Sequence, residues 1–201
     1  QLLRTEDGGA SGDQSANRAF DGLGDTRAFY ETVFRRHSID GNGMRLDGYI
    51  HFGDGYTNAF WDGHQMVFGD GDHQVFADFT TSLDVIGHEL SHGVTEHTAG
   101  LQYHFQPGAL NESISDVMGS LVKQWKLRQP AAEADWLIGA ELFTPDIPAD
   151  ALRSLKAPGQ AYDNAILGKD PQPAHMRDYV VLPDTEEGDF GGVHINSGIR
   201  N

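Results

Sequence analysis

The stretch His88-Glu89-Leu90-Ser91-His92 decides how the rest of the sequence is interpreted. In a helix, His88 and His92 project from the same face, one turn apart. Two imidazoles so placed can bind one Zn²⁺ at roughly 2.0–2.1 Å. Glu89 then lies beside the ion, where a base can take a proton from the water that such a metal holds. The pattern favours a metal site with an adjacent base over a surface helix carrying two unrelated histidines.

A third ligand is needed, and the sequence offers Glu96, Glu112 and the acids near the C-terminus. Glu112 is favoured because it opens a second amphipathic helix, predicted over 110–126, on which Asp116 shares its face. Asn111 and Asp116 could hydrogen-bond the outer nitrogens of the ligand histidines. Glu112 could equally be a solvated acid at a helix start, stabilised by the helix dipole. The residues alone leave both readings open.

Composition limits the class of protein and of metal site. The 201 residues are 38% hydrophobic and 10% aromatic, as in a globular protein, and carry a net charge of −16, which excludes nucleic acid as a partner. No apolar run is long enough for a membrane span, so no membrane partner is expected. Cysteine is absent, so a zinc site must use histidine and carboxylate.

The remaining elements are predicted from periodicity and turn residues. We expect a helix over 16–34 with a break at Gly22 and Gly24, and then an antiparallel sheet with hairpins from runs at 49–52, 58–61 and 65–68. The motif helix is predicted to start near Thr81, with Thr81 and Asp84 in capping-box spacing.

Further along the chain, Pro130 is predicted to stop the second amphipathic helix. A short helix is predicted over 149–155, and a loop over 191–198 that enters a new element. The segment 40–43 is predicted to be a plain turn in preference to a calcium loop, because Met44 stands where another oxygen ligand belongs.

Four blocks, in order and with fitting gaps, resemble the thermolysin family of zinc endopeptidases: Asn58–Trp61, Gly87–Thr95, Gly108–Asp116 and Gly192–Ile199. The short N-terminal part and Asp170–Asp178 are most similar to the protealysin branch. The resemblance implies an α+β fold with two lobes. Residues 1–97 would form an antiparallel, β-rich lobe ending in the zinc-binding helix, and residues 98–201 the start of a helical C-terminal lobe that is incomplete here.

The resemblance also implies roles for individual residues. His88, His92 and Glu112 would bind zinc, Glu89 would be the general base, and Asn111 and Asp116 would hold the ligand histidines. Tyr103 and His194 would stabilise the oxyanion, with Asp189 orienting His194. Substrate would contact Asn58, Ala59, Trp61 and Arg153, and a pocket with an apolar wall made of Phe76, Phe79, Val85, Ile138, Leu142 and Leu152.

The implied function is a zinc endopeptidase that acts on peptides or proteins and cleaves before bulky hydrophobic residues. A zinc aminopeptidase is disfavoured, because an edge strand and an open groove suit internal bonds. An inactive zinc-binding fragment that serves as a structural or partner-binding module is the alternative. A removed propeptide and secretion, with the signal segment outside this sequence, are implied, and an intracellular location is the alternative.

The paired-calcium site of some family members is expected to be absent. Asp84 and Asp135 are retained, but Lys123, Leu137 and Ala140 stand where carboxylates would be expected, and calcium needs about six to eight oxygens. Lys123 would place its ammonium where the cation charge was needed. A weaker calcium site near Thr144, Ile147 and Asp150 is less favoured than an ordinary turn.

Overall fold

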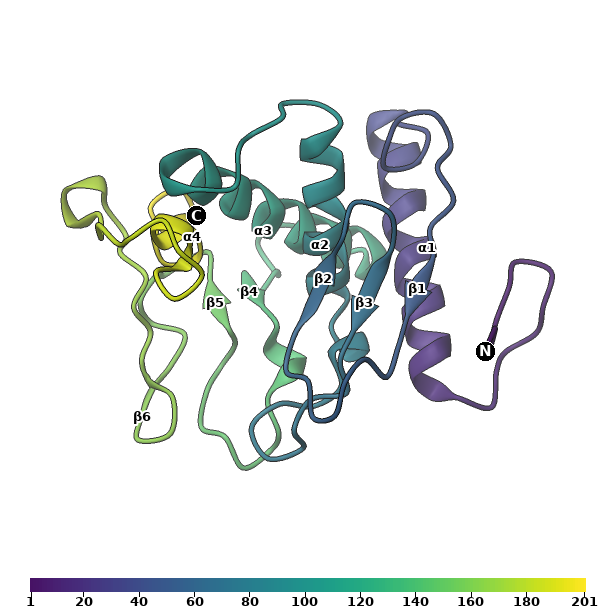
Figure 1. The fold of residues 1–201 in the computed structure, drawn as a ribbon, viewed down its shortest axis with the longest axis horizontal. Helices are drawn as coiled ribbons and strands as arrows, with labels where there is room; N and C mark the ends of the chain where they lie inside the picture. Colours follow the sequence, from purple (N-terminus) through teal and green to yellow (C-terminus); the bar gives the residue numbers. More distant parts are fainter.

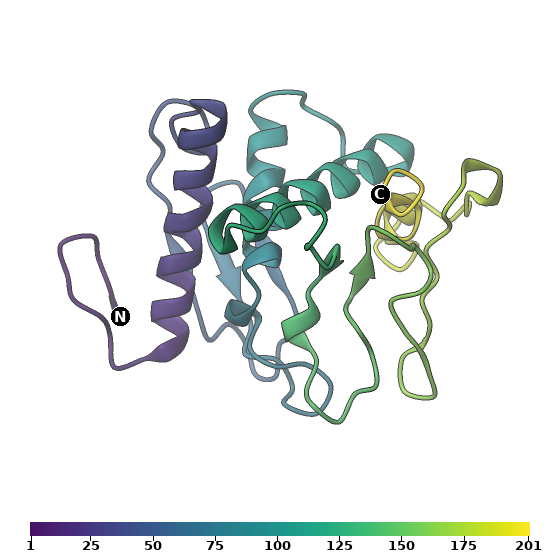
Figure 2. The ribbon, with the colours of Figure 1, turned by 180° about the vertical axis from the view of Figure 1, so that it is seen from behind.

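Three helices form the centre of the protein, described from a computed structural model of residues 1–201. The helices α1 (Gln14–Phe34) and α2 (Leu83–Glu96) stand beside one another, and α3 (Phe105–Leu127) runs across them (Figure 1, Figure 2). Short strands cover one side of this group. Long helices with short strands confirm the predicted α+β class. No helix combines the length and the apolar character that a membrane crossing requires.

The first helix, α1, is continuous, so the break predicted at Gly22 and Gly24 does not occur. It begins after Asp13, whose side chain caps a first-turn amide at 3.1 Å, and ends where Arg35 takes a left-handed conformation with φ of 54°. Gly22 serves packing instead, because a Cβ there would lie 2.5 Å from the Cδ1 atom of Ile86 in α2.

The second helix, α2, starts two residues later than predicted, and the capping box of Thr81 and Asp84 is wrong. Thr81 belongs to a 3₁₀ turn, η1 (Phe79–Thr81), and Ser82 is the N-cap residue. The hydroxyl of Ser82 donates to the carboxylate of Asp84 at 2.5 Å instead of capping a backbone amide.

The third helix, α3, extends beyond its predicted ends. It starts at Phe105 and includes Pro107 in its first turn, where the missing N–H of proline costs nothing. It ends at Leu127, because Arg128 takes a left-handed conformation with φ of 57°. Pro130, predicted to stop the helix, lies beyond this end.

The largest sheet contains β1 (Gly48–Tyr49), β3 (Met66–Phe68) and β2 (Ala59–Trp61), in that order. The pairing of β2 with β3 is antiparallel as predicted, but β1 runs parallel to β3, which the sequence did not predict. The strand predicted over 49–52 ends early, at Tyr49, because His51, with φ of 58°, turns the chain away from the sheet. β2 is therefore an outer strand, and one of its edges has no strand partner.

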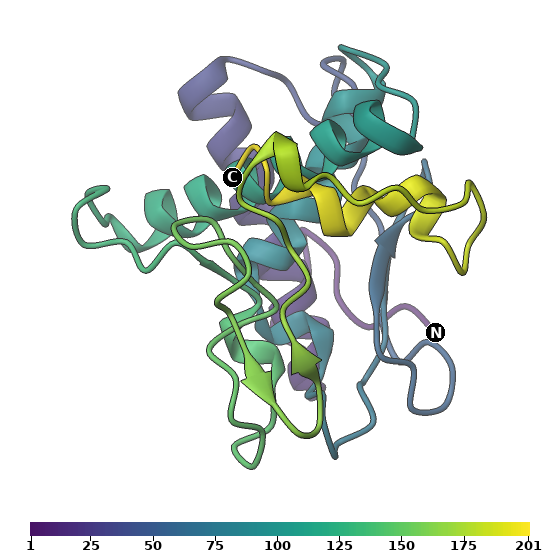
Figure 3. The same ribbon diagram turned by 90° about the vertical axis from the view of Figure 1, so that its left-hand side faces the viewer.

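Two-stranded sheets form the other end of the molecule. β4 (Leu137–Ile138) pairs with β5 (Arg153–Ser154), and β6 (Asp163–Asn164) with β7 (Gly168–Lys169) makes a hairpin that extends away from the helices (Figure 3). The helix predicted over 149–155 is wrong, because Arg153 and Ser154 of this segment pair with β4 and Ala149 forms a bridge with Tyr162.

The remaining short elements are the 3₁₀ turns η2 (Ala140–Leu142) and η3 (Met176–Asp178), followed by the last helix, α4 (Asp189–Ser197). α4 occupies most of the segment predicted as a loop, so that prediction was wrong. Its start is irregular, with φ between 47° and 86° over Phe190–Gly192. This left-handed turn lets the carboxylate of Asp189 accept a hydrogen bond from the amide of His194 at 2.9 Å.

Two predicted turns that were weighed against calcium sites have oxygens that accept ordinary hydrogen bonds from backbone amides. The carboxylate of Asp40 accepts from the amides of Asn42 and Met44 at 2.8 and 3.0 Å, as expected for a plain turn. The carbonyl of Thr144 accepts from the amide of Ile147 at 3.0 Å, which closes the turn considered as a weaker calcium site.

The helices α2 and α3 cross at two glycines. A Cβ on Gly87 would lie 3.1 Å from the Cα atom of Gly119, and a Cβ on Gly119 would overlap the carbonyl oxygen of Asp84. Only residues without a side chain allow so close an approach. As a consequence, Glu112 and Asp116 of α3 face the histidines of α2.

Further along the same face of α3, Lys123 pairs with Asp84. Its Nζ atom lies 2.6 Å from Asp84 Oδ2, 3.3 Å from Asp135 Oδ2 and 3.2 Å from the carbonyl oxygen of Leu137. Burial lowers the pKa of Lys123, but the Asp84 carboxylate outweighs burial, so the pKa is raised. A buried ion pair therefore joins the two helices at neutral pH.

We expect Gly119→Ala to lower the free energy of unfolding by about 1–3 kcal/mol, the usual cost of overpacking. The control is Gly24→Ala in α1, where a Cβ would meet nothing within 4 Å. That change should raise stability by about 0.5–1 kcal/mol, because alanine favours the helix. Urea unfolding of both variants measures the difference. A Gly119→Ala protein as stable as the control would contradict the close crossing.

His51 links the start of α1 to the segment after β3. Its ring nitrogens lie 2.8 Å from Asp13 Oδ2 and 2.7 Å from Asp70 Oδ1. The hydrogen bonds to these carboxylates, Asp13 first, raise the pKa of His51. Because the folded-state pKa is raised, the imidazolium stabilises the fold fully below the unfolded-state pKa of about 6.5. The contribution is lost as pH rises through the folded-state pKa.

His51→Gln should therefore reduce Tm more at about pH 5.5 than at about pH 8.5. The difference should be no more than a few degrees, because the pairs are exposed. Thermal unfolding of the wild type and variant, followed by circular dichroism at both pH values, isolates this group. An equal loss of Tm at both values would show that the charge of His51 has no role.

Candidate metal centre

Two histidines on one face of α2 begin the site. His88 and His92 lie one turn apart, and their Nε2 atoms are 3.0 Å from each other. Glu89, next to His88, is half-buried, and its carboxylate makes no hydrogen bond with another side chain. Its charge contributes to raising the pKa values of Tyr103 and Arg153, so it lies at the same site.

Glu112 enters the site from α3. Its Oε2 atom lies 3.3 Å from His88 Nε2, and its Oε1 atom lies 3.3 Å from His92 Nε2. The ligand atoms that these three residues can offer lie within 4.8 Å of one another. Glu112 is fully buried, and its Oε2 atom has no hydrogen-bond partner. A buried carboxylate oxygen without a partner, facing two imidazole nitrogens, fits a metal ion.

The charges of the cluster point to the same conclusion. Burial lowers the pKa of His88, but Glu112 and Asp116 outweigh burial and raise this pKa to about 10. Burial raises the pKa of Glu112, whereas His194, His92 and His88 together hold it well below its usual range. The cluster therefore favours positive charge at its centre, which a dication would supply.

The outer nitrogens of both histidines are held by α3. His92 Nδ1 lies 2.9 Å from Asn111 Oδ1 and 3.2 Å from Ser115 Oγ. His88 Nδ1 lies 2.8 Å from Asp116 Oδ1, although without the alignment of a straight hydrogen bond. The sequence pointed to Asn111 and Asp116 but missed Ser115, which lies one turn after Asn111 and could have been found by that spacing.

Arg153 contacts a carboxylate inside the protein. Its Nε and Nη2 atoms donate to the two oxygens of Asp116 at 2.8 and 2.6 Å. Burial raises the pKa of Asp116, but Arg153 and then His88 outweigh burial, so this pKa lies far below its usual range. Arg153 thus reaches His88 through Asp116, a link that the resemblance did not imply.

Tyr103, His194 and Asp189 form a chain that leads to Glu112. The hydroxyl of Tyr103 donates to Glu112 Oε1 and lies 3.2 Å from His194 Nε2. His194 Nδ1 lies 2.5 Å from Asp189 Oδ1. Burial and then the Glu112 carboxylate raise the pKa of Tyr103, so its hydroxyl keeps its proton. The structure thus brings together Tyr103 and His194, which were expected at the oxyanion, and Asp189, which was expected to orient His194.

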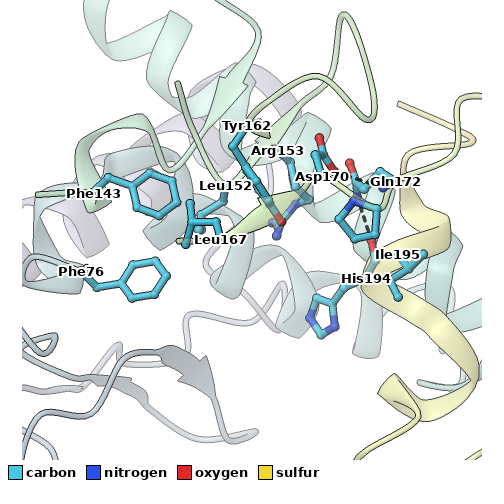
Figure 4. A pocket seen from close by; sticks show the side chains of 11 residues that line it. Phe76, Phe143, Leu152, Arg153, Tyr162, Leu167, Asp170, Gln172, His194 and Ile195 are labelled. Carbon is cyan, nitrogen blue, oxygen red and sulfur yellow. Dashed lines mark hydrogen bonds between the residues drawn. The ribbon is translucent and has the colours of Figure 1, made fainter. Parts of the chain in front are cut away.

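The residues expected to bind substrate divide into two groups. Asn58 directly precedes β2, and Ala59 and Trp61 lie on this outer strand, one edge of which has no strand partner. The amide of Ala59 donates to Asn58 Oδ1 at 2.9 Å. Phe76, Leu152 and Arg153 line a pocket beside the metal centre (Figure 4). The other residues expected at the apolar wall are buried in the core and do not line this particular pocket: Phe79, Val85, Ile138 and Leu142.

Comparison with known proteins identifies the fold. Residues 5–96 match the model of the thermolysin metallopeptidase catalytic domain, and residues 99–201 match that of the alpha-helical domain. A precursor of protealysin, a metalloproteinase from Serratia proteamaculans, has a similar structure. It shows a TM-score of 0.93 and 54% identity over 98% of this chain and 60% of that one.

Two curated relatives cover the whole chain. Protease PrtS of a Photorhabdus species is 54% identical over 200 residues, and an extracellular metalloprotease of Pectobacterium carotovorum is 53% identical over 201 residues. This chain spans about half of their lengths, 53% and 57%. With both family models matched along almost the whole sequence, the protein belongs to the thermolysin family of metallopeptidases.

Proposed function

We propose that this protein is a zinc-dependent endopeptidase that hydrolyses internal peptide bonds before a bulky hydrophobic residue. The observation that carries the proposal is the convergence of His88, His92 and Glu112 on one point, with Glu89 beside them on α2. Two histidines and a glutamate are the zinc ligands of thermolysin itself, and we transfer them to this chain residue by residue. Zinc, when bound, activates water and polarises a carbonyl group.

Glu89 is the general base in this proposal. Its carboxylate, free of hydrogen bonds to other side chains, accepts a proton from the attacking water and passes it to the leaving amine. Tyr103 and His194 donate hydrogen bonds to the oxyanion that forms. Asp189 keeps the ring of His194 in place through Nδ1, so that Nε2 faces the site. Each such donor is worth about 2.7–4 kcal/mol of transition-state stabilisation.

Substrate binds as an added strand in this proposal. Asn58 and the edge of β2 at Ala59 and Trp61 pair with an extended peptide through backbone hydrogen bonds. Arg153 supports the substrate carbonyl from the pocket side. Its Nε and Nη2 atoms are engaged with Asp116, which leaves Nη1 free to donate.

Glu89→Gln is expected to retain zinc but to reduce kcat by about 10²–10⁴-fold, because the base is lost while the ligands remain. His92→Ala should lose both zinc and turnover, because one of three ligands is missing. Elemental analysis of each purified variant, together with cleavage of an internally quenched peptide, separates the two effects. A zinc-replete Glu89→Gln protein that cleaves at the wild-type rate would refute the proposed role of Glu89.

We further propose that the paired-calcium site is absent, because the Lys123 ammonium lies between Asp84 and Asp135. Removing this internal cation by Lys123→Met would leave the Asp84 carboxylate buried without its charge partner. The expected loss of stability is about 3–5 kcal/mol. The control is Lys126→Met, which breaks the more exposed pair with Asp25 and should cost less than about 1 kcal/mol.

Calcium at millimolar concentration should not raise the Tm of the wild type, because the lysine already neutralises the acids. A calcium-dependent rise in Tm would contradict this part of the proposal.

The remaining assignments concern the lobes, secretion and a propeptide. We place the two lobes at 1–97 and 98–201, a division supported by the meeting of the two family matches between residues 96 and 99. Relatives named as extracellular support secretion, and a relative named as a precursor supports a removed propeptide.

An inactive zinc-binding module is the second candidate function. One observation favours it: Leu110, Ile114 and Val117 form an apolar row on α3 that is more than a third exposed. Such a row could bind a partner. Peptidase assays of the 201-residue chain and of a longer chain separate the candidates, since full activity of the short form would exclude this module.

A further inference from the structure

A pocket of about 230 Å³ lies beside the metal centre (Figure 4). Phe76 and Phe143 line one end, His194 lines the other, and Leu152 and Arg153 lie between them. The His194 end adjoins the metal ligands, because His194 Nε2 lies 3.5 Å from Glu112 Oε1. The volume is below the range of roughly 300–1,000 Å³ that holds drug-sized ligands. It suits one or two amino-acid side chains.

The hairpin of β6 and β7 supplies the outer wall of this pocket. Tyr162, directly before β6, and Leu167, in the turn, both line it. Neither residue belongs to the blocks that carry the family resemblance, and no periodic pattern marks a hairpin this short.

The turn of the hairpin fixes which side chain enters the pocket. Asn164 Oδ1 accepts hydrogen bonds from the amides of Ile166 and Leu167, each at 2.9 Å, and Gly168 closes the turn with φ of 78°. As a result, Leu167 points into the pocket, whereas Ile166 points away and is 59% exposed.

The base of the hairpin is tied to α4. The carboxylate of Asp170 accepts from the amides of Ala161 and Gln172, both at 3.1 Å. The Nε2 atom of Gln172 donates to the carbonyl oxygen of His194 and to Ser197 Oγ, both at 2.8 Å. The hairpin is therefore a fixed wall, held to the helix that carries His194.

The charged side chains that line the pocket already have partners. Arg153 is bound to Asp116, Asp170 to backbone amides and His194 to Asp189. Arg153 keeps only Nη1 free, and the proposed function assigns this atom to the substrate carbonyl. A charged side chain entering the apolar end would lose its hydration without gaining a partner. The pocket therefore favours an apolar side chain.

We propose that Tyr162 and Leu167 of the hairpin are specificity-determining residues, which select an apolar side chain on the amine side of the scissile bond. The choice of side rests on the proposed endopeptidase function, in which Arg153 supports the carbonyl beside the pocket. The contribution of the hairpin rests on the geometry of the pocket alone.

The test compares Leu167→Ser with Ile166→Ser, a matched change on the same turn that faces solvent. Two series of peptides vary the first and the second residue after the scissile bond between leucine and alanine. In the wild type and Ile166→Ser, leucine should be preferred at one of these positions. In Leu167→Ser that preference in kcat/KM should fall by about 10-fold. An unchanged preference in Leu167→Ser, or an equal loss in Ile166→Ser, would overturn the assignment.

A binding measurement separates this inference from the proposed function. Leucyl-leucine amide should shift the methyl NMR signals of Leu152 and Leu167 in the wild type, and glycylglycine amide should not. If these signals respond although no peptide is cleaved, the pocket assignment stands and the endopeptidase proposal fails. Suppose instead that peptides are cleaved, that leucyl-leucine amide does not shift these signals, and that Leu167→Ser keeps the wild-type preference for leucine. Only the pocket assignment then fails.

Discussion

The close crossing of α2 and α3 is the contact on which the other features depend. On α3, Glu112, Asp116, Gly119 and Lys123 follow one another at intervals of four, three and four residues, so they form one row along the helix. Gly119 is the point of closest approach, since no side chain fits between it and α2. Residues before it in the row face the histidines, and Lys123 after it faces Asp84. One packing contact thus sets both the metal centre and the buried ion pair.

The charged residues of this row are buried, and burying a charge costs free energy. Taking an unpaired carboxylate out of water costs several kcal/mol, so each buried acid needs a cation beside it. Asp84 has Lys123, Asp116 has Arg153 and His88, and Glu112 has imidazoles on three sides. The imidazoles are the only partners in this series that can also bind a metal. The lysine therefore joins α3 to α2, and the arginine joins α3 to β5, both independently of zinc. The Glu112 end depends on what occupies the centre.

The sequence predicted correctly those features that follow from the spacing of residues along one helix. The spacing of two histidines on one helix, and of Glu112 and Asp116 on the next, fixed which side chains share a face. It failed where distant contacts decide the outcome. Within the segment 149–155, Arg153 and Ser154 form a strand because β4 lies beside them, and Arg153 turns to Asp116 because that carboxylate is buried nearby. The left-handed turn of α4 is likewise stabilised by the bonds that Asp189 makes with the residues after it.

The site and the pocket are built on elements of different kinds. The metal cluster is supported by two long helices, locked by glycines and ion pairs, so its geometry tolerates little change. The outer wall of the pocket is a hairpin with a turn of three residues, and its hydrogen bonds go to its own backbone and to Pro148, not to a metal ligand. Replacing Leu167 therefore alters the shape of the pocket without moving Glu112 or the histidines. Gln172 is the exception, since its bonds to the His194 carbonyl and to Ser197 couple the base of the hairpin to α4. Variation in selectivity is thus least costly at the turn and most costly at the base.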